Sequence, residues 1–122
     1  MKHSQEFLQL VERVKPQIKE LTMAEVRVHL ERNPQARLID VREDHEWKES
    51  HAERAMHLGR GIIERDIVAQ VPDKTMELIL YCGGGYRSAL VAANLQMMGY
   101  QKVFSLVGGF RAIQESGYPV VV

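Results

Sequence analysis

The residues best suited to chemistry in this chain lie in one loop, Cys82–Ser88, which reads Cys-Gly-Gly-Gly-Tyr-Arg-Ser and holds the only cysteine. The loop follows the apolar run 78–81 and precedes an Ala/Leu-rich segment, so the sequence predicts strand, glycine turn and helix in that order. The first N–H groups of a helix lack internal partners and attract an anion. A thiol placed there should ionise easily and hold an anionic or sulfur-bearing group.

The other residues of the loop fit the same chemistry. Three consecutive glycines allow positive φ angles and bring backbone amides close to a guest. Arg87, five residues after Cys82, adds a fixed charge and a forked set of donors, and the Ser88 hydroxyl can bond the loop or the thiolate. A buried structural cysteine beside a glycine turn is the alternative. The combination of these residue types favours a catalytic loop.

The elements that must position this loop are short apolar strands alternating with helices. Such an order predicts an α/β fold with a parallel sheet covered on both faces. The expected strands cover residues 38–41, 56–58, 78–81 and 103–106. The expected helices cover 4–14, 22–33 (opened by a capping box at Thr22), 44–49, 62–70, 87–98 and 108–116.

Ligands bind beyond the carboxyl ends of the strands in such sheets. Residues 40–42, 82–87 and 108–109 each follow a predicted strand end. We therefore expect these three segments to converge on one rim of the sheet.

Length and composition restrict the classes of function. The chain has 122 residues, enough for one domain, with 45% hydrophobic and 26% charged residues. Sixteen basic residues balance sixteen acidic ones, so neither nucleic acid nor an anionic membrane is an expected partner. The polar start and the lack of a long apolar run predict no signal peptide and no membrane span. A single free thiol fits a reducing compartment, and the cytoplasm is the expected location.

Several motifs together resemble the single-domain rhodanese family. They are Asp40-Val41-Arg42-Glu43 with Glu46-Trp47, the Cys82–Ser88 loop, and Gly108-Gly109-Phe110. The resemblance spans about residues 17–122 and implies a rhodanese-like fold, a small central parallel sheet flanked by helices on both faces. Residues 1–16 are then expected to form a helical extension packed on that domain.

The resemblance implies a sulfurtransferase that moves a sulfane sulfur from a donor such as thiosulfate to a thiol or cyanide, with a protein as another possible acceptor. Cys82 would be the nucleophile and carry the sulfur as a persulfide, with no metal or organic cofactor. Asp40 and Arg42 would hold the loop through hydrogen bonds and an ion pair. The chain is expected to act as a monomer or weak dimer. The residues whose amides would cradle the persulfide are Gly83, Gly84, Gly85, Tyr86, Arg87 and Ser88.

The loop departs from the family pattern because positions 83–85 are all glycine, where efficient thiosulfate users often have a basic side chain. Arg87 is the only cation in the loop, so affinity for doubly charged thiosulfate is expected to be weak and the donor stays open. Tyr86 could offer an apolar wall to a thiol acceptor or pack on the helix.

Two other functions fit a loop of this kind. One is a persulfide carrier or thiol-sensing module that serves a dedicated partner protein. The other is a phosphatase or arsenate reductase, but related phosphatases have five residues between cysteine and arginine, whereas this loop has four. A phosphatase also needs a carboxylic acid to protonate the leaving group, and none can be identified near the loop from the sequence.

The remaining titratable residues are expected to have ordinary structural roles. The five histidines do not pair at the i, i+3 or i, i+4 spacing typical of metal ligands, so no metal site is predicted. A charged face near the rim is expected from four neighbouring carboxylates, Glu43, Asp44, Glu46 and Glu49. A solvated helix surface is their expected role, and modulation of donor access is the alternative.

Overall fold

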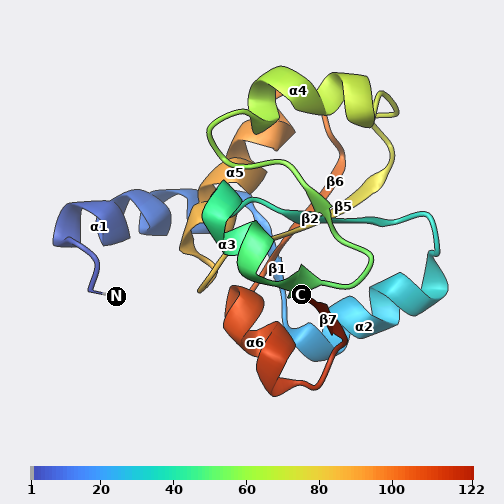
Figure 1. The fold of residues 1–122 in the computed structure, drawn as a ribbon. Coiled ribbons are helices and arrows are strands. Elements are labelled where there is room, and N and C mark those ends of the chain that lie inside the picture. The colour runs from blue at the N-terminus through green and yellow to red at the C-terminus, as the bar shows by residue number, and fades with distance from the viewer. Residues whose placement is uncertain (1) are drawn as a thin grey trace.

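The computed structural model describes residues 2–122, and Met1, the first residue of the predicted extension, lies outside the described residues. Figure 1 shows a central sheet with helices on both of its faces. The strands are β1 (Lys19–Leu21), β2 (Arg37–Asp40), β3 (His51–Ala52), β4 (Met56–His57), β5 (Glu77–Tyr81), β6 (Lys102–Leu106) and β7 (Val120–Val121). The helices are α1 (Gln5–Val14), η1 (Lys15–Gln17), α2 (Met23–Arg32), α3 (Asp44–Glu49), α4 (Ile63–Gln70), α5 (Tyr86–Met97) and α6 (Gly109–Glu115).

Five strands form the main sheet in the order β1-β6-β5-β2-β4, and every pair in it is parallel. The strand that leads to the cysteine, β5, is central, with β2 and β6 on its two sides. The carboxyl ends of all three strands therefore meet at one edge, and the predicted parallel α/β architecture is confirmed.

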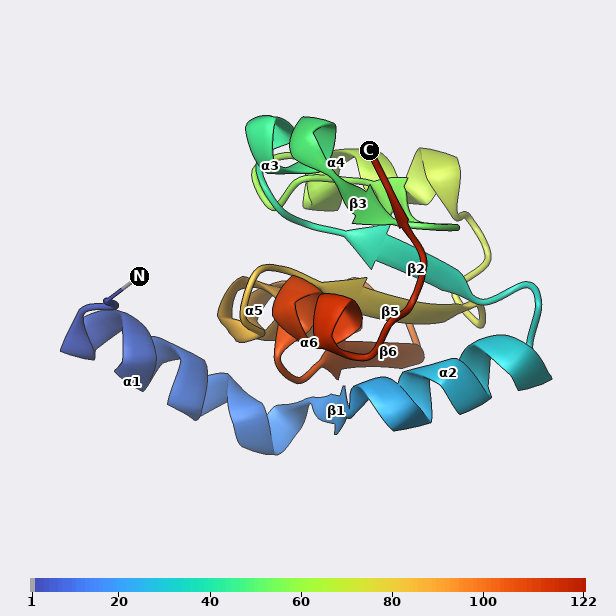
Figure 2. The ribbon, with the colours of Figure 1, turned by 60° about the horizontal axis from the view of Figure 1, so that its bottom comes forward.

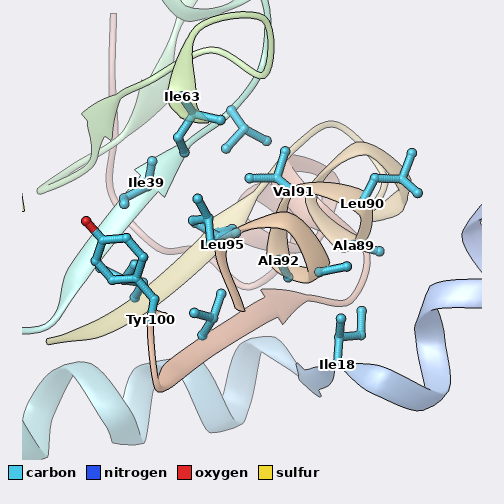
Figure 3. Packing of buried hydrophobic residues seen from close by; sticks show 14 of the residues in the cluster. Ile18, Ile39, Ile63, Ala89, Leu90, Val91, Ala92, Leu95 and Tyr100 are labelled. Atoms are coloured by element: carbon cyan, nitrogen blue, oxygen red, sulfur yellow. The ribbon is translucent and has the colours of Figure 1, made fainter. Parts of the chain in front are cut away.

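Alternating residues of the strands pack on opposite faces of the sheet, as the twofold strand period requires. On one face Ile39, Leu80 and Val103 join side chains of α1, α4 and α5 in a single apolar cluster. Figure 3 shows this cluster around Leu95 and Val91 of α5. On the other face, side chains of α2 and α6 pack over the intervening strand residues.

The N-terminal helix α1 begins after Ser4, whose hydroxyl accepts a hydrogen bond from the backbone of Phe7. It contacts α5, and Val11 is buried to 1% exposure between them. Figure 2 shows α1, β1 and α2 following one another along the β1 edge of the sheet.

Two features were not predicted from the sequence. The edge strand β1 has one buried residue in three, and β3 pairs with β7 as a separate antiparallel ribbon of two residues each. Segments this short carry too few alternating residues to show a strand period. In the part of the chain from residue 2 to 122, no helix has the length and apolar character needed to cross a membrane.

Candidate active site

The sulfur of Cys82 lies at the end of β5, buried to 1% exposure, and receives two backbone N–H groups. The amide of Gly85 donates to Sγ at 3.1 Å and that of Ser88 at 3.4 Å. Both amides belong to the start of α5, whose first N–H groups have no partners in the helix. The strand, glycine turn and helix predicted around the cysteine are confirmed, and they direct donors at the sulfur.

A buried pair of serines supports the sulfur from the side of β6. The Cys82 thiol lies 3.5 Å from the Ser88 hydroxyl, which in turn lies 2.8 Å from the Ser105 hydroxyl. Both serines are fully buried. Ser105 was missed by the sequence analysis, although a serine inside the apolar strand 103–106 was a signal that could have identified it.

The start of α6 fixes the start of the loop through its backbone. The amide of Phe110 donates to the Cys82 carbonyl at 2.7 Å, and the amide of Arg111 donates to the Gly83 carbonyl at 3.4 Å. Gly109 has a φ of +54°, and a Cβ on it would lie 2.3 Å from the Cys82 carbonyl oxygen. Only glycine allows this close approach of two backbone segments.

Gly85 closes the turn in a left-handed conformation with a φ of +100°. This conformation turns the chain from the loop into α5, for which Gly85 is the N-terminal cap residue. A Cβ on Gly85 would lie 3.2 Å from the backbone nitrogen of Gly108. The predicted convergence of the loop with residues 108–109 is therefore confirmed by direct backbone contact.

Arg87 is fixed by a carboxylate of α3. Its guanidinium donates to the two Glu46 carboxylate oxygens at 2.8 Å and 3.2 Å. These hydrogen bonds lower the pKa of Glu46 to about 2, even though partial burial opposes ionisation. The same bonds raise the pKa of Arg87, assisted by the nearby Cys82 sulfur and against its partial burial.

Asp40, the last residue of β2, and Arg42 form a buried ion pair. The Arg42 guanidinium donates to Asp40 at 2.8 Å and to the Ser50 carbonyl at 2.7 Å, and lies 4.1 Å from the ring centroid of Phe110. Burial disfavours the charged form of Arg42, but the hydrogen bonds and charge of Asp40 outweigh it and raise its pKa. Through Phe110, whose amide bonds the Cys82 carbonyl, the pair connects to the loop.

A cavity of about 810 Å³ opens above the sulfur. Two arginines outside the loop line it, Arg60 after β4 and Arg111 on α6. Four aromatic rings line it as well: His3 and Phe7 of the N-terminal segment, Tyr86 of the loop and His45 of α3. Arg87 is the only cation within the loop sequence, and it is the fold that brings Arg60 and Arg111 to the same rim.

No carboxylic acid could be identified beside the loop from the sequence, and the structure places both Glu43 and Glu46 in the lining of this cavity. The expected solvated surface holds for Asp44 and Glu49, which are exposed, but not for Glu46, which is half-buried against Arg87. Within residues 2–122 no group of three or more His, Cys, Asp or Glu side chains could hold a metal ion.

Comparison with known proteins gives a family for this arrangement. The family model described as Rhodanese-like domain matches residues 22–116. A relative named thiosulfate sulfurtransferase GlpE, from Coxiella burnetii, is 33% identical over 73 residues, which cover 60% of this chain and 66% of the relative.

A second relative and a solved structure widen the comparison. A tRNA uridine(34) hydroxylase from Cronobacter sakazakii is 31% identical over 108 residues, or 82% of this chain, but the match spans only 31% of that enzyme. A Rhodopseudomonas palustris structure, described as a protein of unknown function and possible tyrosine phosphatase, has a TM-score of 0.81. It is 23% identical and aligns over 99% of this chain and 98% of its own, so it shows the same fold, α1 included.

Proposed function

Because the chain belongs to the family of rhodanese-like domains, we propose that it is a sulfurtransferase in which Cys82 carries a sulfane sulfur from a donor to an acceptor. The observation that carries this proposal is the pair of amides, from Gly85 and Ser88, directed at the Cys82 sulfur on the floor of an open cavity. Such preorganised donors stabilise an anionic sulfur without reorganisation. We propose small partners: a sulfur donor and a thiol or cyanide acceptor.

In the first half-reaction the Cys82 thiolate attacks the outer sulfur of thiosulfate. A new sulfur–sulfur bond forms at Cys82, the bond inside thiosulfate breaks, and sulfite leaves with the electron pair. In the second half-reaction an acceptor thiolate or cyanide attacks the outer sulfur of the Cys82 persulfide. The Cys82 thiolate then leaves with its electron pair, so a covalent intermediate divides the transfer into two displacements. Neither step needs a metal or an organic cofactor.

The distribution of charge supports an anionic donor. Arg87 is held by Glu46, so its charge is largely neutralised within the cavity wall. Arg60 and Arg111 line the cavity, and both are exposed. We propose that these two arginines attract the sulfonate end of thiosulfate in place of the basic loop residue that the three glycines lack.

A phosphatase is less well supported by the same geometry. Phosphoester cleavage needs a protonated carboxylic acid for the leaving oxygen. Glu46, with a pKa of about 2 and two hydrogen bonds from Arg87, is ionised at neutral pH. The loop also has four residues between Cys82 and Arg87, one fewer than in related phosphatases. Its Gly85 and Ser88 amides lie 3.1 Å and 3.4 Å from the Cys82 sulfur itself.

A steady-state assay tests the proposal. Wild type should form thiocyanate from thiosulfate and cyanide with ping-pong kinetics, because the donor leaves as sulfite before the acceptor reacts. Cys82→Ser should fold normally and form none. Thiocyanate formation by Cys82→Ser at the wild-type rate would contradict the proposal. A persulfide that only a protein acceptor discharges would instead identify a persulfide carrier.

A further inference from the structure

Three rings from two separate parts of the chain form one wall of the cavity above Cys82. The His3 ring lies 4.8 Å from that of Tyr86 and 5.1 Å from that of Phe7, measured between centroids, and the Phe7 and Tyr86 rings lie 6.4 Å apart. All three side chains are half-buried and line the cavity. We call these three residues the aromatic wall.

The aromatic wall depends on the N-terminal segment. The match to the rhodanese-like domain family begins at residue 22, whereas His3 and Phe7 precede it. Helix α1 holds Phe7 in place, because Val11 on the same helix is buried against the cluster around α5. His3 lies just before this helix, with its ring against those of Phe7 and Tyr86. The segment outside the family match therefore contributes directly to the space in which Cys82 reacts.

The size of the cavity exceeds what thiosulfate or cyanide requires. Its volume of about 810 Å³ lies in the range of pockets that hold drug-sized ligands, roughly 300–1,000 Å³. Thiosulfate has no apolar part that could gain from contact with aromatic rings. The aromatic wall therefore makes no favourable apolar contact with thiosulfate, and its apolar surface is available to another reactant.

We propose that the aromatic wall binds the apolar, ring-bearing body of a low-molecular-weight acceptor thiol. This inference rests on the proposed sulfurtransferase function and names the acceptor class. The acceptor sulfur must approach the outer sulfur of the persulfide, which extends from Cys82 into the cavity, so its substituent lies along the cavity wall. Tyr86 belongs to the cysteine loop itself and lines the same cavity as Cys82, so a substituent on its ring lies close to the reacting sulfur. Aromatic pairs add stabilisation beyond the apolar area they bury.

Binding can be tested without sulfur transfer, using benzyl methyl sulfide as an unreactive probe and dimethyl sulfide as its counterpart without a ring. We expect the benzyl probe to bind about 10-fold or more tightly and to shift the NMR signals of His3, Phe7 and Tyr86. Phe7→Leu, which keeps an apolar side chain, and His3→Ala should each weaken binding about 3- to 10-fold. Leu8→Ala is the control, because Leu8 lies on α1 but is exposed and does not line the cavity. Equal binding by all variants would overturn the proposal.

The reaction is tested with benzyl mercaptan and 2-mercaptoethanol, two alkyl thiols that differ in the ring. Wild-type persulfide should be discharged about 10-fold faster by benzyl mercaptan at equal low concentration, and this preference should decline in Phe7→Leu and His3→Ala but not in Leu8→Ala. Persulfide formation from thiosulfate should stay unchanged in Leu8→Ala, and Phe7→Leu and His3→Ala should slow it much less than they slow discharge by benzyl mercaptan. A preference that survives both substitutions, or a loss confined to persulfide formation, would overturn the acceptor role. If the protein binds the benzyl probe but never forms a persulfide, the proposed sulfurtransferase function is refuted and the cavity is an apolar binding site only.

Discussion

The floor and the rim of the cavity are built in different ways. At the floor, backbone groups set the geometry: amides of Gly85 and Ser88 point at the Cys82 sulfur, and Gly109 lies against the Cys82 carbonyl. At the rim, exposed or half-buried side chains from α1, α6 and the segment after β4 line the opening. The floor is buried and the rim is open to solvent.

This difference separates the chemistry from the choice of reactant. The backbone geometry of the floor cannot change unless the strands and helices that hold it move. It therefore determines the reaction of the Cys82 sulfur. Exposed rim side chains such as Arg60 and Arg111 can be replaced with little effect on the fold. We therefore expect substitutions at the floor to abolish transfer, and substitutions at the rim to change which donor or acceptor is used.

The largest effect is expected for Gly109→Ala, which would break the floor. Its Cβ would lie 2.3 Å from the Cys82 carbonyl oxygen and 2.8 Å from the Gly83 backbone, and its φ of +54° disfavours a side chain. Displacement of the loop should slow persulfide formation about 100-fold and lower the free energy of unfolding by about 3 kcal/mol. Urea unfolding and rapid-quench mass analysis measure the two effects.

Gly61→Ala is the matched control, because a Cβ there would meet nothing within 4 Å and its φ is not in the positive range. It should keep wild-type stability and rate. Equal behaviour of Gly109→Ala and Gly61→Ala would show that the backbone contact beneath Cys82 does not determine the geometry of the floor.

Arg87→Ala tests the connection between floor and rim. It removes two charge-assisted hydrogen bonds and leaves the Glu46 carboxylate unpaired beside the cavity, where it repels an anionic donor. We expect a loss of about 10- to 100-fold in kcat/KM for thiosulfate. Adding Glu46→Gln to Arg87→Ala should recover part of this loss. No recovery in the double variant would mean that the unpaired carboxylate is not the cause.

The Glu46–Arg87 pair should also make stability depend on pH. The folded-state pKa of Glu46, about 2, lies below the ordinary value of 4.5, so the contribution of the pair is complete above about pH 4.5 and declines as the pH falls towards 2. We expect wild type to exceed Glu46→Gln by about 1–2 kcal/mol at neutral pH, reduced by partial solvent screening. Urea unfolding across this range measures the difference. Glu49→Gln, an exposed position on the same helix, should show none, and a pH-independent difference for Glu46→Gln would refute the ion pair.

The smallest effects are expected at the cationic part of the rim. Arg60→Ala and Arg111→Ala should each raise KM for thiosulfate about 2- to 5-fold, because single exposed charges interact weakly. The increase should shrink at high salt, whereas discharge by an uncharged thiol should not change. Arg65→Ala, an exposed arginine on α4 outside the cavity, is the control. An equal loss of kcat/KM with every donor and acceptor would show that these arginines take part in the reaction itself.

The floor was largely predictable from the sequence because its signals are local. A strand, a cysteine, a glycine turn and a helix are contiguous, and the parallel sheet places residues 108–109 beside them. The partner of Ser88 was not predictable in the same way, because Ser105 is 17 residues away and only the register of β5 and β6 brings it close.

The rim was mostly beyond sequence reasoning. Glu46 is 41 residues from Arg87, and although Glu46-Trp47 is one of the motifs of the family resemblance, nothing in that motif indicates Arg87 as its partner. The contact between His3 and Tyr86 depends on how α1 packs against α5, which the apolar stripe of α1 does not specify. Long-range packing, and not residue type, selects the side chains that line the opening.

The central claim, that Cys82 on its backbone floor carries sulfur, is tested most directly by intact-protein mass after brief exposure to thiosulfate, followed by cyanide. We predict that wild type gains one sulfur atom, that peptide analysis places it on Cys82, and that cyanide removes it as thiocyanate, whereas Cys82→Ser gains none. A wild-type protein that gains no sulfur from thiosulfate or from polysulfide, or an equal gain by Cys82→Ser, would contradict the account.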